Sequence, residues 1–218
     1  RDELKVKVLN IEPAGNISAI SAARQIPTIN DFWSKSVSEK VIEKYQKPKL
    51  ITATNVFAHV DDIHLFLKNV KRCLNDEGLL VLEFPYLVDL IKKNEFDTIY
   101  FEHLSYFPIS SIVELTKSLG MTVVCVKKLA IHGGSVRVHI SPNEGQNPDV
   151  SVNEFFQRER KEGYHQLEIY LEWAQRVDEL INNLTIQITK LKVDGARIAA
   201  FGASAKGNTL LNACLIRA

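Results

Sequence analysis

The chain has 218 residues, of which 45% are hydrophobic and 24% are charged, a composition that predicts a folded core rather than a disordered segment. Its 27 Lys and Arg against 26 Asp and Glu give a formal charge of +1, which excludes a general nucleic-acid binder because such proteins need a surplus of cations. No apolar run reaches the ~18 residues needed to span a bilayer and no signal-peptide pattern opens the chain, so we expect no membrane partner and a cytoplasmic location.

The cysteines and histidines do not predict a metal site. Cys73, Cys125 and Cys214 are far apart, which favours neither a disulfide framework nor a zinc knuckle. His59 and His64 are five residues apart, a poor spacing for one face of a helix, and no third ligand is near them in sequence.

Strand and helix patterns alternate along the first two thirds of the chain. Apolar runs predict strands at Lys5–Ile11, Thr28–Ile29, Leu50–Ala53 and Leu79–Phe84. Helical patterns are predicted at Ile17–Arg24 with Asn16 as its cap, at Ile63–Leu74 with Asp61 or Asp62 as its cap, and at Ile112–Leu119. This alternation with short turns predicts an α/β fold with a doubly wound, parallel, Rossmann-like sheet.

The last strands of this unit and the residues after it follow other patterns. Met121–Leu129 and Ser135–Ile140 alternate around a Gly-Gly turn and predict an antiparallel pair at the sheet edge. Ser141–Pro148 is typical of a linker, and apolar residues from Leu167 to Leu191 repeat with the spacing of one long amphipathic helix. Arg197–Phe201 predicts a strand, followed by a small-residue turn and a helix from Asn208. We therefore predict one domain over residues 1–145 and the start of a second α/β domain over residues 146–218.

Three acidic or amide residues lie where parallel strands are predicted to end. Glu12 follows the first strand, where a carboxylate can accept both hydroxyls of a ribose; the alternative is a solvated turn acid. Asp31 follows the short second strand, where an acid can meet an adenine amine, and Asn55 follows the third. We expect these residues to contribute to a cofactor site.

The run Tyr100-Phe101-Glu102-His103 combines groups suited to proton transfer beside a carbonyl. A histidine is a natural base, a neighbouring carboxylate can fix its tautomer, and a tyrosine hydroxyl can donate to an oxyanion. The alternative is a cluster at a helix start with a structural histidine. His59 is predicted at the carboxyl end of the Leu50 strand, on the ligand side of the sheet.

The stretch Gly202–Thr209 resembles a phosphate-binding loop but lacks the Walker A lysine, because Asn208 occupies that position. Lys206 in the predicted loop and the helix start behind it could still hold a phosphate on backbone amides; the alternative is a close-packed turn.

Taken together, five stretches resemble the sugar-nucleotide C-methyltransferases, which use S-adenosylmethionine to methylate a carbon beside a keto group on a dTDP-deoxysugar. They read IEPAGNISAISA, TNVFAHVDDIHLFLKNVKRCLNDEGLLVLEFPYL, NEFDTIYFEHLSYF, IHGGSVRV and AAFGASAKGNTLLN, and they extend over nearly the whole chain. The resemblance implies a cofactor loop rich in glycine and a zinc-binding region upstream of Arg1, and the rest of a second domain downstream. The chain is then expected to be an interior fragment, with no metal of its own.

The resemblance also implies roles for individual residues. His103 matches the catalytic base, Glu102 and Tyr100 match its partners, His59 matches a second active-site histidine and Glu12 matches the ribose ligand. Substrate contacts are expected from Tyr86, Gly133, Ser135 and Lys206. The family often has histidine where this chain has Phe101, a departure that bears on the substrate more than on the reaction.

Two other functions are compatible with parts of the sequence. An NAD-dependent oxidoreductase would also use an acid after a strand for its ribose, and a GxGxxG motif upstream would favour it. A non-catalytic relative could keep the fold and bind a nucleotide ligand, although the intact residues Tyr100, Glu102 and His103 argue against it.

Overall fold

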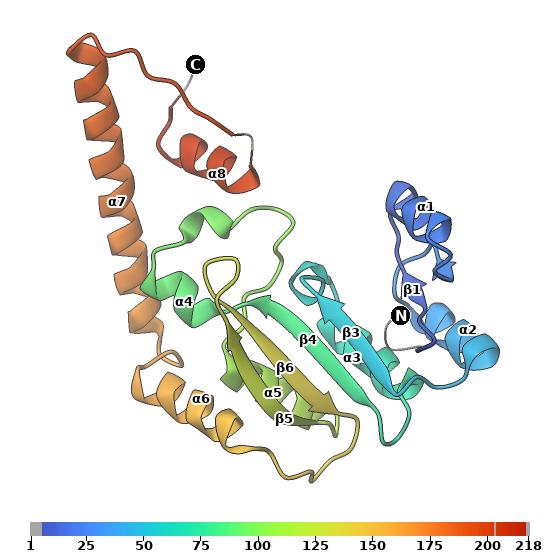
Figure 1. Cartoon of the computed structure of the whole chain (residues 1–218). Coiled ribbons are helices and arrows are strands. Elements are labelled where there is room, and N and C mark those ends of the chain that lie inside the picture. Colours follow the sequence, from blue (N-terminus) through green and yellow to red (C-terminus); the bar gives the residue numbers. More distant parts are fainter. Residues whose placement is uncertain (1–5, 203, 217–218) are drawn as a thin grey trace.

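The computed structural model describes residues 6–202 and 204–216 and is a mixed α/β structure (Figure 1). Its strands are β1 (Asn10–Ile11), β2 (Thr28–Ile29), β3 (Leu50–Thr54), β4 (Leu79–Pro85), β5 (Thr122–Leu129) and β6 (Ser135–Ser141). Its helices are α1 (Gly15–Ala23), α2 (Lys35–Tyr45), α3 (Ile63–Cys73), α4 (Leu87–Lys92), α5 (Ile109–Ser118), α6 (Val150–Lys161), α7 (Leu167–Val193) and α8 (Ala205–Ala213), with short 3-10 turns η1 (Phe57–His59) and η2 (Phe96–Thr98).

The described strands form two sheets. The larger has the order β3-β4-β6-β5, in which β3 and β4 are parallel and β6 is antiparallel to both β4 and β5. The predicted antiparallel pair is therefore confirmed, with β5 at the edge. The smaller sheet pairs β1 with β2 in parallel, and it stands with α1 and α2 to one side of the larger sheet (Figure 1).

The core lies between the larger sheet and the helices packed on it. It contains alternate side chains of the central strands, such as Leu80, Leu82, Val136 and Val138, all of which are fully buried. Helix α3 contributes Leu67 and Val70 because its apolar residues fall on one face. The side chain of Asp62 caps α3 by accepting from the backbone N–H of Leu65 at 2.8 Å, as one of the two predicted caps.

The expected division near residue 145 does not coincide with a division of the core. Helix α6 packs against β5, and its Val152 and Phe155 belong to the same core cluster as the sheet. Tyr164 is buried there too, and Trp173 at the start of α7 packs against the cluster. The second domain expected from residue 146 onward stays a prediction.

Three local expectations are wrong within the described residues. Arg197–Phe201 is not a strand, because no described strand lies beside it to complete its backbone hydrogen bonds. The side chain of Phe201 is fully exposed. The first strand is limited to the two residues that pair with β2. Helix α1 begins after Ala14 without a side-chain cap, so Asn16 is not its cap. Lys5 and Ala203, which belong to two predicted elements, lie outside the described residues.

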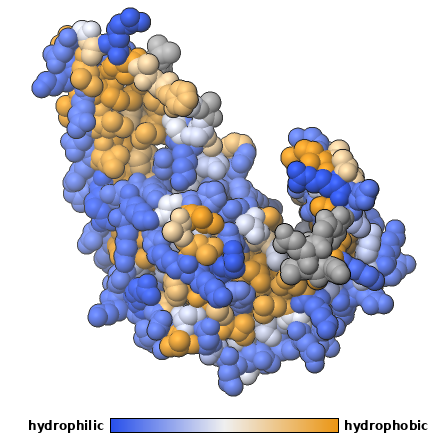
Figure 2. All heavy atoms as spheres, in the orientation of Figure 1, coloured by the Kyte–Doolittle hydropathy of each residue, from blue (hydrophilic) through white to orange (hydrophobic). Residues whose placement is uncertain are grey.

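Helix α7 confirms the predicted long helix and leaves much of its apolar face uncovered. None of its 27 residues, all of which the structure describes, is buried. Figure 2 shows the apolar surface over this helix, to which Leu171, Ile186, Leu191 and Val193 contribute exposed side chains. No helix in the described part of the chain is both long and apolar enough to cross a membrane.

Candidate active site

The segment that follows η2 is attached to η1 by backbone hydrogen bonds. The N–H groups of Leu104 and Ser105 both donate to the carbonyl oxygen of Ala58, at 2.9 and 3.2 Å. Because η1 follows the carboxyl end of β3, this attachment brings His103 beside His59. Their ring centroids are 4.9 Å apart, so two residues 44 positions apart in sequence lie in one cluster.

His103 is held at both ring nitrogens. Its Nδ1 lies 2.7 Å from the carbonyl oxygen of Thr98, and its Nε2 lies 3.2 Å from the hydroxyl of Tyr100. A carbonyl oxygen can only accept, so Nδ1 carries the proton and donates to Thr98. In the neutral ring Nε2 is then the unprotonated nitrogen, which accepts from the Tyr100 hydroxyl and has the lone pair that a base needs.

His59 has the same tautomer for the same reason. Its Nδ1 lies 2.7 Å from the carbonyl oxygen of Glu102 and donates to it, which leaves Nε2 as the acceptor in the neutral ring. The side chain of His59 is exposed, whereas that of His103 is half-buried. The structure thus brings together all four residues expected at the reacting centre: His59, Tyr100, Glu102 and His103.

The contact made by Glu102 differs from the expected one. Its carboxylate is exposed and has no hydrogen-bond partner among the residues that the structure describes, so it does not orient the ring of His103. The carbonyl oxygen of Thr98 does so instead. Glu102 acts on the cluster through its own backbone carbonyl, which holds His59.

Thr98 and Tyr106 were not identified from the sequence. Thr98 is buried, and its carbonyl oxygen also accepts a hydrogen bond from the Tyr106 hydroxyl at 3.3 Å. Burial raises the pKa of Tyr106, which keeps this hydroxyl protonated as a donor. The ring of Tyr106 meets that of His103 edge-on at 6.2 Å. A backbone carbonyl carries no residue-type signal, so no sequence pattern could have pointed to Thr98.

The residues expected to hold the cofactor follow the carboxyl ends of β1, β2 and β3, of which β1 and β2 form one sheet and β3 belongs to the other. Glu12 follows β1 and Asp31 follows β2, and the amide of Asn30 donates to the carbonyl oxygen of Glu12 at 2.8 Å, which ties these strand ends together. One carboxylate oxygen of Glu12 accepts from the N–H of Ala14 at 2.8 Å. The Glu12 carboxylate has further acceptor capacity, which suits a ribose.

Asn55 follows β3 and has two unusual features, its backbone conformation and a buried side-chain oxygen without a partner among the described residues. Its φ of 53° is in the left-handed region, which asparagine tolerates better than most residues. Its side-chain oxygen is buried and has no hydrogen-bond partner among residues 6–202 and 204–216. A buried orphan acceptor is costly unless something donates to it, and the amine or hydroxyls of S-adenosylmethionine would do so. The acceptor of Asn55 and the carboxylates of Glu12 and Asp31 have the chemistry to accept hydrogen bonds from the polar groups of that cofactor.

Two of the four expected substrate contacts are buried in the core. Tyr86 is 1% exposed and its hydroxyl donates to Glu159 at 2.7 Å, while Ser135 is fully buried and donates to the carbonyl oxygen of Ile131 at 3.2 Å. Neither side chain presents a free polar group to a ligand, so the structure assigns both to packing. Gly133 is in the exposed turn between β5 and β6. Lys206 is in the first turn of α8 rather than in a loop.

No group of three or more His, Cys, Asp or Glu in the described part of the chain is placed to hold a metal ion. The three cysteines are free thiols, of which Cys73 and Cys214 are buried.

Comparison with known families identifies the chain. Residues 3–126 match the family model of the methyltransferase domain, and residues 130–218 match that of the C-methyltransferase C-terminal domain. The chain belongs to the S-adenosylmethionine-dependent C-methyltransferases. The resemblance inferred from the sequence motifs is confirmed at this level, and S-adenosylmethionine is the cofactor of the family.

One relative supports the placement of the chain within this family of C-methyltransferases. It is 34% identical over 209 residues to the C-methyltransferase NovU of Streptomyces niveus. The aligned residues cover 95% of this chain and 50% of NovU. The chain therefore spans about half the length of the curated relative that it matches. Among solved structures, an S-adenosylmethionine-dependent methyltransferase of Thermotoga maritima aligns over 65% of this chain and 75% of its own, with 14% identity and a TM-score of 0.48. The magnesium protoporphyrin IX methyltransferase of Synechocystis aligns over 63% and 64%, with 9% identity and a TM-score of 0.45.

Proposed function

We propose that the protein transfers a methyl group from S-adenosylmethionine to the carbon beside the keto group of a nucleotide-linked deoxysugar, through an enolate. The observation that carries this proposal is the orientation of His103, whose Nε2 is the unprotonated nitrogen and lies beside the hydroxyl of Tyr100. A base and a hydroxyl donor side by side are the two groups that enolate formation needs.

In the first step His103 removes a proton from the carbon beside the carbonyl. The C–H electron pair forms the carbon–carbon double bond of the enolate, and the carbonyl electron pair moves to oxygen. The proton goes to Nε2, which accepts only a hydrogen bond from Tyr100 before the substrate binds. The Tyr100 hydroxyl can then donate to the enolate oxygen instead, and His59 is close enough to the cluster to serve as a second donor when protonated.

The cofactor supplies an electrophilic methyl group to the enolate carbon. Glu12 would accept hydrogen bonds from the ribose hydroxyls of the cofactor, and Asp31 would accept one from the adenine amine. The unpaired side-chain oxygen of Asn55 would accept a hydrogen bond from another donor of the cofactor. Asn55 is four residues before His59, so the strand end that would meet the cofactor continues directly into the histidine cluster. This continuity favours methyl transfer over a site that only binds a nucleotide.

One observation supports a sugar nucleotide as the substrate. The motif that contains Lys206 leads into α8, which packs against η2 beside the catalytic segment. Lys206 is half-exposed at the start of that helix, where a cation and free backbone N–H groups would suit a diphosphate. Gly133, the other expected substrate contact, has a φ of 79° that is strained for other residues, and the Glu95 carboxylate lies where a Cβ atom would be.

The test is exchange of the substrate's hydrogen beside the carbonyl with deuterated water, in the presence of S-adenosylhomocysteine, which blocks methyl transfer. His103→Asn should lower this exchange by roughly 10²–10⁴, the usual contribution of a positioned general base, while leaving cofactor binding in place. The matched control is His64→Asn, since His64 is exposed on α3. Exchange at the wild-type rate in His103→Asn would make His59 the leading candidate for the base.

A further inference from the structure

The carbonyl of Thr98, which orients His103, is held by side chains. Thr98 is the last residue of η2, and the donors to its carbonyl oxygen in the described part of the chain are the Nδ1–H of His103 at 2.7 Å and the hydroxyl of Tyr106 at 3.3 Å. A carbonyl outside a regular backbone ladder depends on such donors for its hydrogen bonds. The contact that sets the tautomer of His103 therefore depends in part on Tyr106.

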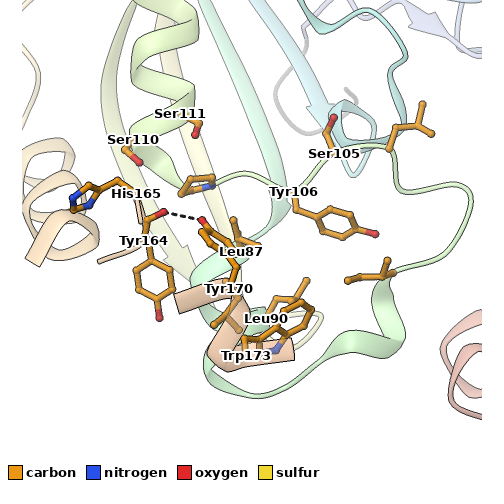
Figure 3. A pocket seen from close by; sticks show the side chains of 14 residues that line it. Leu87, Leu90, Ser105, Tyr106, Ser110, Ser111, Tyr164, His165, Tyr170 and Trp173 are labelled. Carbon is orange, nitrogen blue, oxygen red and sulfur yellow. Dashed lines mark hydrogen bonds between the residues drawn. The ribbon is translucent and has the colours of Figure 1, made fainter. Parts of the chain in front are cut away.

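Tyr106 lies between two hollows of the molecule. It contributes to the wall of a cavity of about 490 Å³ beside α4 and the start of α7, and also to a small hollow beside His103. In Figure 3 the ring of Tyr106 lies apart from those of Tyr164, Tyr170 and Trp173, and its hydroxyl points away from them. The hydroxyl is thus directed at the segment after η2 and not at the three rings across the cavity.

The surroundings of Tyr106 connect its hydroxyl to both partners of the His103 ring. Burial, followed by the charge of the Tyr100 phenol, raises the pKa of Tyr106, so the hydroxyl stays protonated at physiological pH. The backbone N–H of Tyr100 hydrogen-bonds the phenol oxygen and acts on the pKa in the opposite direction. One hydroxyl therefore contacts the backbone of Thr98 and of Tyr100. These are the two residues that hydrogen-bond Nδ1 and Nε2 of His103.

Packing alone would give Tyr106 a different role. Its ring meets that of His103 edge-on at 6.2 Å, a contact that phenylalanine would keep. The hydroxyl adds the bond to the Thr98 carbonyl, which phenylalanine would lose. The residues that line the small hollow are all described, and none is Asp, Glu, Lys or Arg, so no charged side chain there could replace the hydroxyl.

We propose that Tyr106 is a positioning residue for the base: its hydroxyl holds the Thr98 carbonyl in place and so keeps His103 in the tautomer with an unprotonated Nε2. The inference deepens the proposed function and rests on it for the role of His103. A histidine side chain without such a contact favours the other tautomer, in which Nε2 carries the proton and has no lone pair for the substrate's hydrogen. Loss of the hydroxyl should therefore slow proton removal without weakening substrate binding.

The direct test is nitrogen-15 NMR of the chain labelled at histidine, at about pH 8, where an ordinary histidine is neutral. In the wild type the Nδ1 and Nε2 resonances of His103 should lie far apart, because only Nδ1 carries a proton. They are identified as the signals that disappear in His103→Asn. In Tyr106→Phe the two resonances should move toward each other as the tautomers mix, with the tautomer ratio changed by roughly two- to tenfold, the effect of one hydrogen bond.

Tyr170→Phe is the matched control. The Tyr170 hydroxyl also donates to a backbone carbonyl, that of Tyr164 at 2.7 Å, and its ring lines the same cavity as Tyr106. This variant should leave the His103 resonances where they are in the wild type. Unchanged resonances in Tyr106→Phe, or equal changes in Tyr106→Phe and Tyr170→Phe, would overturn the proposal.

Deuterium exchange of a dTDP-linked keto-deoxysugar gives a second readout. In Tyr106→Phe, exchange at saturating sugar should fall roughly three- to tenfold while KM is unchanged. A loss that appears only in KM would overturn the positioning role, because it would place the hydroxyl on the substrate. Converging resonances in Tyr106→Phe, together with exchange at the wild-type rate in His103→Asn, would support the contact of Tyr106 with Thr98 and refute the proposed function.

Discussion

The Nδ1 of His103 lies 2.7 Å from the carbonyl oxygen of Thr98, five residues earlier in the chain. The orientation of the candidate base is therefore fixed by the backbone rather than by an ionisable side chain. Because Thr98 is buried and its carbonyl also accepts from Tyr106, the geometry of this contact depends on the path of the segment after η2. A carbonyl cannot take up the ring's proton, so the tautomer with an unprotonated Nε2 is kept.

This contact predicts a small effect for Glu102→Gln. The carboxylate is exposed and does not touch the imidazole, and the backbone carbonyl that holds His59 is retained in the variant. We expect less than about a tenfold fall in methyl transfer, compared with roughly 10²–10⁴ for His103→Asn. Steady-state rates of the two variants at saturating substrate check this. A loss of comparable size in both would mean that the carboxylate moves onto the imidazole when substrate binds.

Glu12→Ala should weaken cofactor binding more than turnover. Two charge-assisted hydrogen bonds to the ribose are worth about 2–4 kcal/mol together, or roughly 30- to 1000-fold in the dissociation constant. The rate at saturating cofactor should change far less, because Glu12 is not in the histidine cluster. Calorimetric titration with S-adenosylhomocysteine measures the effect, and Glu43→Ala, at an exposed position on α2, is the control. An unchanged dissociation constant would assign Glu12 to a solvated turn.

The sequence was sufficient for the elements whose patterns are set locally. The parallel pair β3 and β4, the antiparallel pair β5 and β6, and the long helix α7 all have the periodicity of their predicted structure. Helix α2 and helix α6 were missed, although Ser34 and Asp149 cap them as sequence rules allow. Both helices are mostly polar, so their short apolar stripes gave a weaker signal than the strands beside them.

The site could be predicted as a set of residue types but not as a set of contacts. His59, Tyr100 and His103 were identified from their chemistry, whereas the hydrogen bonds that orient the two histidines come from the carbonyl groups of Thr98 and Glu102. Such contacts follow from the path of the backbone, to which every residue type contributes the same carbonyl. Tyr86 and Ser135 were expected to contact the substrate but are buried in the core, because the depth of a strand end depends on what packs over it.

Glu159 should be a determinant of stability, because it joins three elements from inside the core. It is 1% exposed and accepts from the Tyr86 hydroxyl and from the N–H groups of Ile109 and Ser110, each at 2.7 Å. These N–H groups open α5, where a carboxylate is also favoured by the helix dipole. Glu159→Ala should lower the free energy of unfolding by about 3 kcal/mol, since it leaves two buried donors and one part-buried donor without partners.

Urea denaturation of the purified chain measures this loss. Glu154→Ala, five residues earlier at an exposed position on α6, is the matched control and should change stability little. Tyr86→Phe should cost about 1–2 kcal/mol, because it removes one donor and leaves the helix contacts in place. Equal midpoints for Glu159→Ala and Glu154→Ala would mean that water replaces the carboxylate.

The last prediction concerns acid sensitivity, which His139 on β6 should increase. Burial lowers the pKa of His139, and its Nδ1 is buried and has no hydrogen-bond partner in the described part of the chain. The folded state therefore binds this proton less readily than the unfolded state, so the free energy of unfolding should fall as the pH falls through the ordinary histidine value of about 6.5. Above that pH both states hold the ring neutral, and this contribution to pH dependence vanishes.

In His139→Gln the loss of stability between about pH 7.5 and pH 5.5 should be smaller than in the wild type, as measured by urea denaturation at each pH. His64→Gln, at an exposed position on α3, controls for removal of one histidine. Parallel curves for the wild type and His139→Gln would show that the strand accommodates the charged ring without cost.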